Sequence, residues 1–454
     1  MNHSVYTLLV VESPVMASII REIAPTSVYT IATGGYCWYP QYNSAKNSLT
    51  ARADPDKIEI RRELKEQAQW ATNVIIATDS DPSGDFIAWS VARYLKRSAI
   101  RRGVIQNLSK PGIIQMLDDV REVDIGFLES RLKNLFLIQT EWTRQKSLPE
   151  KELAGLAAVF GTPGEFTHFL DENNRLFKSS SPVFCAPDEW IPVNRSSENQ
   201  YRIIEPLSTF NLIEKAVGQS ITAEYNEAQV LLQRLYQTIL PNSRQSLISY
   251  PRSSANTFYG QTWENFRSQF IRASLSGELK PIFLQETAPI EEPHESIHPL
   301  NLAETPETVS GEMLKSLGDL YSLIYDHTLS SIKMPEMLGC SYENDLNPEV
   351  YYYSDAEDTS DSQNLTLRPC LTVSDLGKKL FELGIIKPSN FGEKIDKWIA
   401  GKWISEEKSV VSAQNQAKTL GNRAAHFKKI FVDLKSVESR NSLSPETVRG
   451  ILTS

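Results

Sequence analysis

The sequence predicts a multidomain α/β plus α protein, with a parallel sheet at the N-terminal end and a largely helical remainder. Its 454 residues are more than one ordinary hydrophobic core holds, so we expect about two to four domains. Apolar, β-branched runs alternate with helical patterns over residues 1–140, which is typical of a parallel sheet covered on both faces. Further on, helical periodicity predominates, and β-prone pieces occur at 334–370.

Three strand–helix pairs make up the predicted N-terminal sheet. The expected strands are Thr7–Val11, Asn73–Thr78 and Gly103–Ile105, and the helices that follow them are Val15–Ile23, Phe86–Leu95 and Gly112–Asp119. Pro14 fits the first turn of its helix, where an amide proton would have no intrahelical partner. Parallel sheets of this kind bind ligands beyond the carboxyl ends of their strands.

Acidic residues stand at those strand ends. Glu12 follows the first strand, and Asp79 and Asp81 follow the second, with Asp85 a little further on. Asp79 and Asp81 are two positions apart on an extended stretch and therefore point the same way. Mg²⁺ is usually held by one or two carboxylates plus substrate phosphates, so the cluster suits this ion. Helix capping is the alternative; it explains one of the acids well but Glu12 less well.

The segment 247–254 reads Leu-Ile-Ser-Tyr-Pro-Arg-Ser-Ser. Its apolar start predicts a strand that Pro251 ends, because proline has no amide proton for a ladder. Tyr250 then lies where regular structure stops, with Arg252 two residues on. A phenol beside a guanidinium can be a nucleophile directed at phosphate. The alternative is a half-buried packing residue with a wet hydroxyl, and these eight residues alone favour it.

Composition excludes several classes. Hydrophobic content of 41% and charged content of 23% are typical of a soluble globular protein, and we find neither an apolar run that could span a bilayer nor a signal-peptide pattern. We therefore expect a cytoplasmic protein. No CxxC pair exists, which excludes a zinc ribbon. The net charge of −9 argues against a general nucleic-acid binder but allows a local basic groove, because part of the acid lies in the expected loop Asp355–Asp361.

Three short stretches of the sequence resemble motifs of a known family. They read VVESP at 10–14, ATDSD at 77–81 and GDFIAW at 84–89. In this order they resemble the Toprim domain of type IA DNA topoisomerases, and TIATGGYCWYP at 30–40 is similar to the family's glycine-containing loop. Toprim nucleases and primases share the acids, so this domain alone leaves the reaction open.

The second half extends the resemblance. A helical pattern at 221–240, with Gln229 and Tyr236, is followed by SYPR and resembles the segment that delivers the family's nucleophilic tyrosine. HESIHP at 294–299 is similar to the family's HEAIRP, where the histidine contacts DNA phosphate; an ordinary helix start is the alternative. The helical pattern at 371–390 ends in GIIKPSN, similar to GIGRPST, which makes Lys387 and Ser389 plausible phosphate contacts.

The resemblance implies a fold in which the Toprim domain, with its Rossmann-like parallel sheet, precedes a toroidal core of winged-helix-like domains and a β arch. The expected divisions are a Toprim domain at 1–143, two parts of a winged-helix-like domain at 144–200 and 371–454 (with the C-terminal tail), a β-arch or hinge domain at 201–235 and 331–370, and a tyrosine-bearing domain at 236–330.

The resemblance also implies a reaction. Tyr250 would attack a DNA phosphodiester and become joined to the 5′ phosphate, in an ATP-independent strand passage that changes DNA topology. Arg252 would offset charge on the phosphate, and Glu12 would move a proton at the 3′ oxygen. Mg²⁺ would lie on Asp79 and Asp81, with Asp85 as a further ligand. The partner would be DNA, mainly as single strands, contacted by His294, His298, Lys387 and Ser389.

Several positions depart from the family's pattern. Met16 stands where the family usually has a lysine, Ser83 where it has the third acid, and Leu156 and His298 where it has arginines. The groove has therefore lost positive charge. One interpretation is an active topoisomerase, which would be associated with the nucleoid if the host is bacterial or archaeal. A catalytically impaired DNA-binding or partner-binding subunit is the other, and a Toprim nuclease or primase would not need SYPR and HESIHP.

Overall fold

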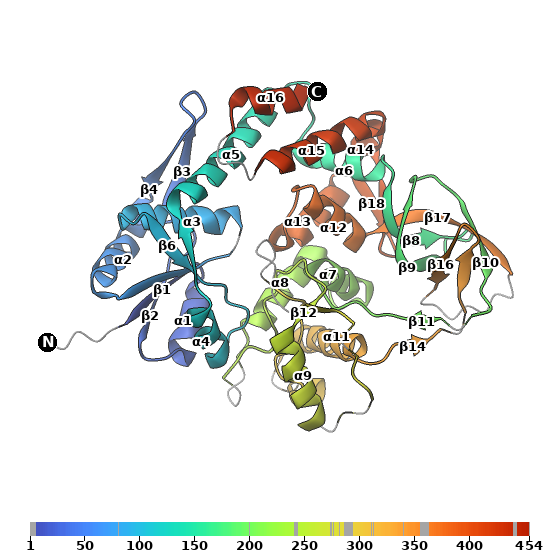
Figure 1. Cartoon of the computed structure of the whole chain (residues 1–454), viewed down its shortest axis with the longest axis horizontal. Helices are drawn as coiled ribbons and strands as arrows, with labels where there is room; N and C mark the ends of the chain where they lie inside the picture. Colours follow the sequence, from blue (N-terminus) through green and yellow to red (C-terminus); the bar gives the residue numbers. More distant parts are fainter. Residues whose placement is uncertain are drawn as a thin grey trace.

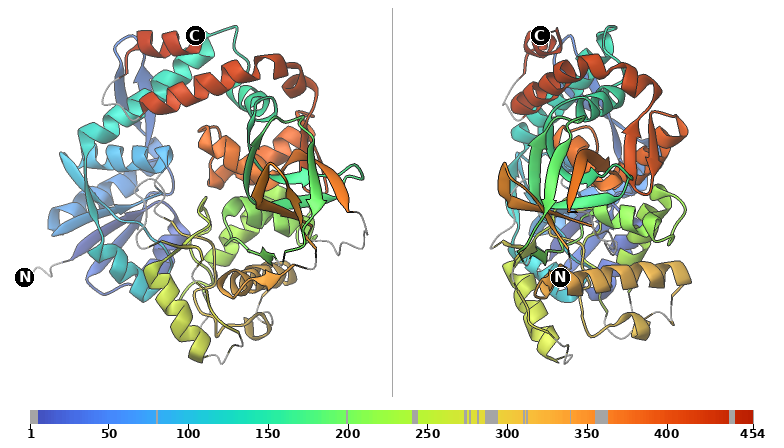
Figure 2. Two further views of the ribbon diagram at one scale, coloured as in Figure 1. Left: turned by 45° about the vertical axis from the view of Figure 1, so that its right-hand side comes forward. Right: turned by 90° about the vertical axis from the view of Figure 1, so that its right-hand side faces the viewer.

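A computed structural model describes residues 6–79, 81–198, 200–239, 244–272, 275, 277–280, 282–285, 294–309, 311, 313–338, 340–354, 363–438 and 443–453. The acidic run 355–361, expected to be a loop, lies outside these residues. Figures 1 and 2 show the elements following one another around a closed circuit, with the N-terminal sheet on one side and a second, antiparallel sheet on the other. The expected fold class, a Toprim sheet followed by a toroidal core, is confirmed.

The N-terminal sheet has the order β2-β1-β5-β6-β7. These strands are β2 (Val28–Ala32), β1 (Thr7–Val11), β5 (Asn73–Ala77), β6 (Ala99–Arg102) and β7 (Arg121–Asp124). The first four run parallel and β7 runs antiparallel to β6. Its helices are α1 (Pro14–Ile23), α2 (Ile58–Trp70), α3 (Pro82–Tyr94) and α4 (Lys110–Asp118), and β3 (Trp38–Asn43) and β4 (Ser48–Ala53) form a hairpin.

Most of this sheet follows the sequence pattern. The fully apolar strands β1 and β5 are neighbours, and their last residues, Val11 and Ala77, are directly paired. The third expected strand was misplaced: it is β6 at Ala99–Arg102, and the chain has left the strand by Gly103. A Cβ on Gly103 would lie 2.3 Å from the sulfur of Met116 in α4. The glycine therefore marks a close approach of helix and backbone, and not a strand interior.

The second sheet is a closed barrel. Its strands β10 (Ile191–Arg195), β15 (Tyr342–Asn344), β16 (Asn347–Tyr353), β9 (Leu176–Cys185), β8 (Gly164–Leu170) and β17 (Asn364–Thr372) pair antiparallel in this order, and β17 also pairs with β10. β19 (Val410–Ala413) and β18 (Ile404–Glu407) extend it from β17. Strands were expected at 334–370, but those at 164–195 were missed, because the pattern LFKSSSPVFC of β9 is polar and interrupted by proline. The divisions between domains stay a prediction; residues 164–195 and 342–372 share one sheet.

Helices connect the two sheets. Long α5 (Ile125–Arg144) leaves the Toprim sheet, and the C-terminal helices α15 (Ala424–Glu438) and α16 (Pro445–Thr453) return to it (Figure 1). The rings of Trp142 in α5 and Phe431 in α15 stack 5.3 Å apart. Asn134 of α5 donates to the carbonyl of Glu438 and accepts from the amide of Leu443. Helix α5 and the C-terminal helices are thus held together on this side of the protein.

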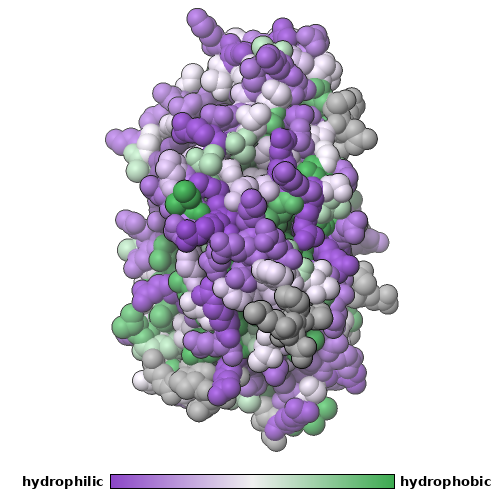
Figure 3. Space-filling view, turned by 90° about the vertical axis from the view of Figure 1, so that its left-hand side faces the viewer, coloured by the Kyte–Doolittle hydropathy of each residue, from purple (hydrophilic) through white to green (hydrophobic). Residues whose placement is uncertain are grey.

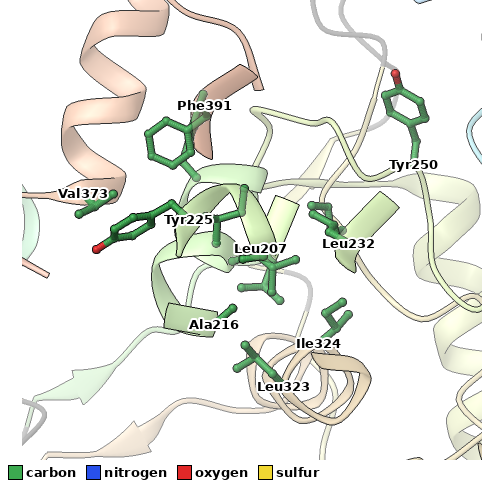
Figure 4. Close-up of a cluster of buried hydrophobic side chains, with 14 of the residues drawn as sticks. Leu207, Ala216, Tyr225, Leu232, Tyr250, Leu323, Ile324, Val373 and Phe391 are labelled. Carbon is green, nitrogen blue, oxygen red and sulfur yellow. The ribbon is translucent and has the colours of Figure 1, made fainter. Parts of the chain in front are cut away.

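A helical cluster lies between the barrel and the Toprim sheet. Its members are α7 (Thr209–Gly218), α8 (Tyr225–Tyr236), α11 (Lys315–Ile332), α12 (Val373–Glu382) and α13 (Phe391–Ala400). Figure 4 shows their shared core, in which Leu207, Leu232, Ile324 and Phe391 meet. The helices expected at 221–240 and 371–390 are confirmed as α8 and α12, both shorter than expected because the ends of helices depend on their caps.

The remaining elements are short or peripheral. They are α6 (Lys151–Phe160), β11 (Tyr201–Arg202), β12 (Phe258–Tyr259), α9 (Gly260–Arg272), β13 (Leu284–Gln285), α10 (Pro306–Val309), β14 (Glu336–Met337) and α14 (Asn415–Thr419). Hydrophilic side chains cover most of the face on the Toprim side (Figure 3). Within the described ranges, no helix combines the length and the apolar character that crossing a membrane requires.

Candidate active site

Two acids converge at the carboxyl ends of adjacent strands. Glu12 comes directly after β1, and Asp79 comes two residues after β5. Burial raises the pKa of the Glu12 carboxyl, the nearby charges of Asp79 and Asp81 raise it further, and Arg252 partly opposes the rise. The expected convergence of Glu12 with the aspartate pair is therefore present. A carboxyl with a raised pKa keeps its proton to a higher pH than an exposed carboxyl does.

Asp81 has two functions at once. It caps α3, where its Oδ1 accepts from the amide of Gly84 at 2.9 Å, so the capping alternative holds for this residue. Its Oδ2 lies 3.1 Å from the Nζ of Lys387. Burial acts to raise the pKa of Asp81, but the Lys387 charge and the Gly84 amide outweigh it, so that the pKa is lowered. Asp81 is thus a stable anion that already has a cationic partner.

Backbone hydrogen bonds hold the tyrosine segment against the Toprim sheet. The amide of Tyr250 donates to the carbonyl of Gln106 at 2.9 Å, and the amide of Ser246 donates to the carbonyl of Leu108 at 2.8 Å. The strand expected to precede Pro251 is wrong: Ile248 forms one isolated bridge to Pro299. The segment is extended but is tied to two different neighbours, so no ladder develops.

Tyr250 points its hydroxyl out of the helical core. Figure 4 shows the phenol oxygen directed away from the cluster that contains Leu232. The hydroxyl interacts with the Asp79 carboxylate, which helps to raise the pKa of Tyr250. Nη1 of Arg252 lies 2.7 Å from Oδ2 of the same carboxylate. Burial and the Asp79 charge raise the pKa of Tyr250 well above its usual range, against the opposing effect of Arg252, so the resting phenol is protonated.

His294 lies against the nucleophile candidate. Its ring stacks on that of Tyr250, with centroids 3.9 Å apart and planes 19° from parallel. Burial lowers the pKa of His294 to about 3, so the imidazole is neutral, and its Nδ1 lies 3.2 Å from Oε1 of Gln106. The alternative of an ordinary surface helix start is wrong, because His294 is buried and irregular in structure.

Two predicted site residues have other environments. Asp85, expected as a metal ligand, lies between two guanidinium groups, with Nη1 of Arg102 at 3.2 Å and Nη1 of Arg131 at 3.1 Å. His298, expected to contact DNA, is 3% exposed, packs edge-on against Phe258 and Phe266, and bonds through Nδ1 to the carbonyl of Ser296. Both side chains therefore make their contacts inside the protein. The Asp85 carboxylate pairs with arginines, and the His298 imidazole packs against phenyl rings.

Lys387 and Ser389 lie near the site on a short turn before α13. Lys387 reaches Asp81, as described above, and the carbonyl of Ser389 accepts from the side chain of Gln229 in α8. The same glutamine accepts from the amide of Gly392 at 2.8 Å. Gln229 therefore joins the helix before the tyrosine to the turn that carries Lys387. Contact of these residues with DNA stays a prediction.

Sequence reasoning missed three residues at this site. Gln106 follows β6 and supports both Tyr250 and His294; its place beyond a parallel strand was a usable signal. Arg102 donates to the carbonyls of Thr78 and Asp79 at 3.1 and 3.0 Å and so supports the acidic loop, without any motif that marks it. Tyr236 was noted only as part of a helix, yet its ring meets that of Tyr250 edge-on at 5.8 Å.

Asp79 and Asp81 fit a divalent ion on the condition that their cationic partners move away. Asp79 and Asp81 supply carboxylate oxygens, which Mg²⁺ prefers. In the described part of the chain, however, no group of three or more acidic, histidine or cysteine side chains has metal-binding geometry. Arg252 and Lys387 occupy Asp79 and Asp81 instead. The donor set therefore suits an ion that also uses substrate phosphate, provided that the two cations withdraw.

A separate cavity of about 1160 Å³ lies between the barrel and the helices α7, α11 and α12. Its walls mix cations and anions, for example Lys178 and Lys378 with Glu205 and Asp326. Neither Tyr250 nor the Toprim acids line it. It is thus distinct from the site around Tyr250.

Comparison with known proteins agrees with this architecture. The family described as Toprim domain matches residues 7–108. Among curated proteins, DNA topoisomerase 1 of Mycoplasma genitalium is 21% identical, with 77% of this chain and 62% of that protein covered. DNA topoisomerase 1 of Campylobacter jejuni is also 21% identical, with 72% and 55% covered. The chain thus spans little more than half of the length of these relatives.

A solved structure resembles nearly the whole chain. Full-length topoisomerase I from Thermotoga maritima superposes with a TM-score of 0.63 at 17% identity and covers 98% of this chain and 89% of that one. At this identity the likeness shows the fold. Together with the matched Toprim residues and the curated relatives, it confirms the resemblance drawn from the motifs.

Proposed function

We propose that this chain, a divergent relative of the type IA DNA topoisomerases, cleaves and rejoins one DNA strand through Tyr250 and so changes DNA topology without ATP. The contact of the Tyr250 hydroxyl with Asp79 carries the proposal. It joins the tyrosine segment to an acid of the Toprim sheet, in a site where a phosphate-binding arginine is also present.

The reaction begins at the phenol. Tyr250 gives its proton to a carboxylate, for which Asp79 is the candidate because it interacts with the hydroxyl, and the phenol oxygen forms a bond to phosphorus. The bond from phosphorus to the 3′ oxygen breaks, and this oxygen takes up a proton. Glu12 is suited to supply that proton, because its raised pKa keeps the carboxyl protonated more readily than an exposed one. Reversal of the same steps rejoins the strand.

Covalent linkage to tyrosine conserves the energy of the phosphodiester. A phenol with an ordinary pKa of about 10 is a good leaving group compared with an alcohol, so rejoining needs no ATP. Arg252 would bind the phosphate oxygens once it leaves Asp79, and a guanidinium is planar and always charged, which suits phosphate. The resting pair with Asp79 keeps this guanidinium beside the phenol.

Mg²⁺ is the proposed cofactor, and it would be held by Asp79 and Asp81 together with phosphate oxygens of the DNA. When bound, such an ion offsets phosphate charge and positions the backbone. Asp85 is not part of this proposal, because its carboxylate already lies within ion-pair distance of two arginines.

The proposed substrate is DNA in single-stranded segments, since only one strand is attacked. Lys387, Ser389 and His294 are the proposed contacts. Positive charge is missing at three places: Met16 packs against the core, Leu156 is fully buried in α6, and His298 is buried between two phenyl rings. We expect binding to be weaker and more dependent on Mg²⁺ than in a chain with cations there.

These losses favour one alternative, a subunit that binds DNA or another protein but cleaves slowly or not at all. Both readings share the fold and differ in the covalent step. The test is therefore the adduct itself, and not DNA binding.

The deciding experiment incubates the protein with negatively supercoiled plasmid over a range of Mg²⁺ and salt. We expect relaxed topoisomers and, after denaturation, protein joined to 5′ phosphate. Tyr250→Phe should abolish both. Tyr321→Phe, which alters a buried tyrosine in α11, should keep both. DNA binding without any adduct from the wild type would favour the alternative.

A further inference from the structure

Tyr236 is a second tyrosine beside the first. It is the last residue of α8, its side chain is fully buried, and its ring meets that of Tyr250 edge-on, with centroids 5.8 Å apart and planes at 86°. Its hydroxyl has no hydrogen-bond partner within the part of the chain that the structure describes. A buried phenol oxygen without a partner is unusual, since most buried polar side-chain atoms are satisfied.

Other buried tyrosines of the same core behave differently. Tyr321 donates to the carbonyl of Glu304 at 2.6 Å, and Tyr325 donates to the carbonyl of Leu302 at 2.8 Å. Leaving a buried donor unpaired is unfavourable, because the group loses its hydrogen bond to water and gains none in the protein. Phenylalanine would fill the same space as Tyr236 without that cost. The unpaired hydroxyl of Tyr236 therefore destabilises the resting state of the protein. This points to a hydrogen-bond partner that is present only in another state.

The surroundings identify the kind of partner. Burial raises the pKa of Tyr236; the negative charge of Asp79 raises it further, and the positive charge of Arg252 opposes the rise. The two tyrosines also influence each other electrostatically. The hydroxyl of Tyr236 is thus influenced by the charges around Tyr250 and stays protonated. A neutral donor in such a place is suited to an anionic acceptor, and the reaction brings a phosphate there.

We propose that Tyr236 is a further catalytic residue, whose hydroxyl donates a hydrogen bond to a phosphate oxygen of the DNA at Tyr250 during cleavage and in the phosphotyrosine state. The inference rests on the proposed function. Tyr236 keeps its own proton throughout. The bond that forms joins the Tyr250 oxygen to phosphorus, the bond that breaks joins phosphorus to the 3′ oxygen, and the phenol proton of Tyr250 goes to a carboxylate.

Tyr236→Phe tests this in three measurements. The urea midpoint of unfolding should equal or exceed that of the wild type, because an unpaired hydroxyl is removed. Single-turnover cleavage of an oligonucleotide should fall about 10²–10³-fold, the effect of one donor lost from a developing charge. In a Tyr250→Phe background, which cannot react, Tyr236→Phe should weaken binding of a single-stranded oligonucleotide several-fold.

Tyr325→Phe is the matched control. It removes a satisfied hydroxyl elsewhere in the core, so it should lower the urea midpoint and leave cleavage by the folded protein unchanged. A lower midpoint for Tyr236→Phe would overturn the inference, because the hydroxyl would then have a resting partner. Unchanged cleavage and unchanged binding would overturn it as well.

The binding measurement separates this inference from the proposed function. If the wild type forms no adduct, the proposed function fails. Weaker binding on Tyr236→Phe in the unreactive background would still support the phosphate contact, and equal binding would sink it.

Discussion

Nη1 of Arg252 lies 2.7 Å from Oδ2 of Asp79, although the two residues are 173 positions apart in the chain. One belongs to the tyrosine segment and the other to the Toprim sheet. The same carboxylate interacts with the hydroxyl of Tyr250 and helps to raise its pKa. The candidate site is therefore complete only when the two parts of the protein are in contact. Separating the parts would expose the phenol and the guanidinium together.

Replacement of Arg252 should impair chemistry more than folding. We expect Arg252→Ala to lower single-turnover cleavage about 10²–10³-fold, the range measured when one donor to a developing oxyanion is removed. Arg252→Lys should restore only part of the rate, because an ammonium cannot bind phosphate through two parallel hydrogen bonds. Rates of adduct formation at saturating DNA measure this. A loss below threefold for Arg252→Ala would contradict the assigned role.

Lys387 should compete with Mg²⁺ for Asp81. Its Nζ lies 3.1 Å from Oδ2 of Asp81, at a carboxylate proposed to hold the ion. Lys387→Gln removes that competitor, so the Mg²⁺ concentration for half-maximal cleavage should fall several-fold. The slope of DNA affinity against salt should become shallower by about one, as expected when one phosphate contact is lost.

Lys394 offers a matched control for this prediction. It lies on α13, just beyond the same turn, and pairs with Glu152 at 2.8 Å. Lys394→Gln should change neither the Mg²⁺ requirement nor the salt slope. Equal Mg²⁺ requirements for Lys387→Gln and the wild type would show that the pair does not oppose metal binding.

Glu12 links the site to pH. Burial first, and then Asp79 and Asp81, raise its pKa in the folded state. The folded protein thus binds this proton more tightly than the unfolded chain, and the contribution to stability is present at low pH and lost as pH rises through the folded pKa. Glu12→Gln should therefore raise the thermal midpoint at pH 7, with a difference that disappears below about pH 4. The same variant should slow cleavage. A midpoint below that of the wild type at pH 7 would contradict this account.

The sequence predicted the acids and the tyrosine because both rest on local rules. Glu12 and Asp79 follow apolar strands whose neighbour relation, Val11 to Ala77, is typical of parallel sheets. The partners of the site were not predictable in this way. Arg102 and Gln106 act through contacts made only when the chain is folded, and no local spacing encodes which acid an arginine meets.

Burial explains why Asp85 and His298 have other environments than the motifs suggested. The sequence of a motif does not show whether its histidine or aspartate faces solvent or is buried against a neighbouring core. His298 is enclosed because Phe258 and Phe266 come together around it, from a helix and a strand that follow Tyr250. The polar strand β9 was missed for a related reason, since a closed barrel tolerates a polar outer face.

His298 should behave as a packing residue. His298→Ala removes a ring between two phenyl groups and a hydrogen bond to the Ser296 carbonyl, so the free energy of unfolding should fall by about 2–4 kcal/mol. The salt slope of DNA binding, measured well below the new midpoint, should stay that of the wild type. A slope shallower by one with unchanged stability would restore the DNA contact predicted from the motif.

Asp85 provides the corresponding test for the metal. Its carboxylate is 4% exposed and lies between Arg102 and Arg131, at 3.2 and 3.1 Å. Removing one member of a buried ion pair strands the other charge and costs about 3–5 kcal/mol, so Asp85→Asn should lower the urea midpoint strongly. The Mg²⁺ concentration for half-maximal cleavage should not change. Asp81→Asn is the contrasting variant, because its carboxylate is proposed to hold the ion: the Mg²⁺ requirement should rise with a smaller loss of stability. The reverse pattern, in which Asp85→Asn is stable and needs more Mg²⁺, would return Asp85 to the metal site. Pairing with the two arginines would then not explain why the acid is present.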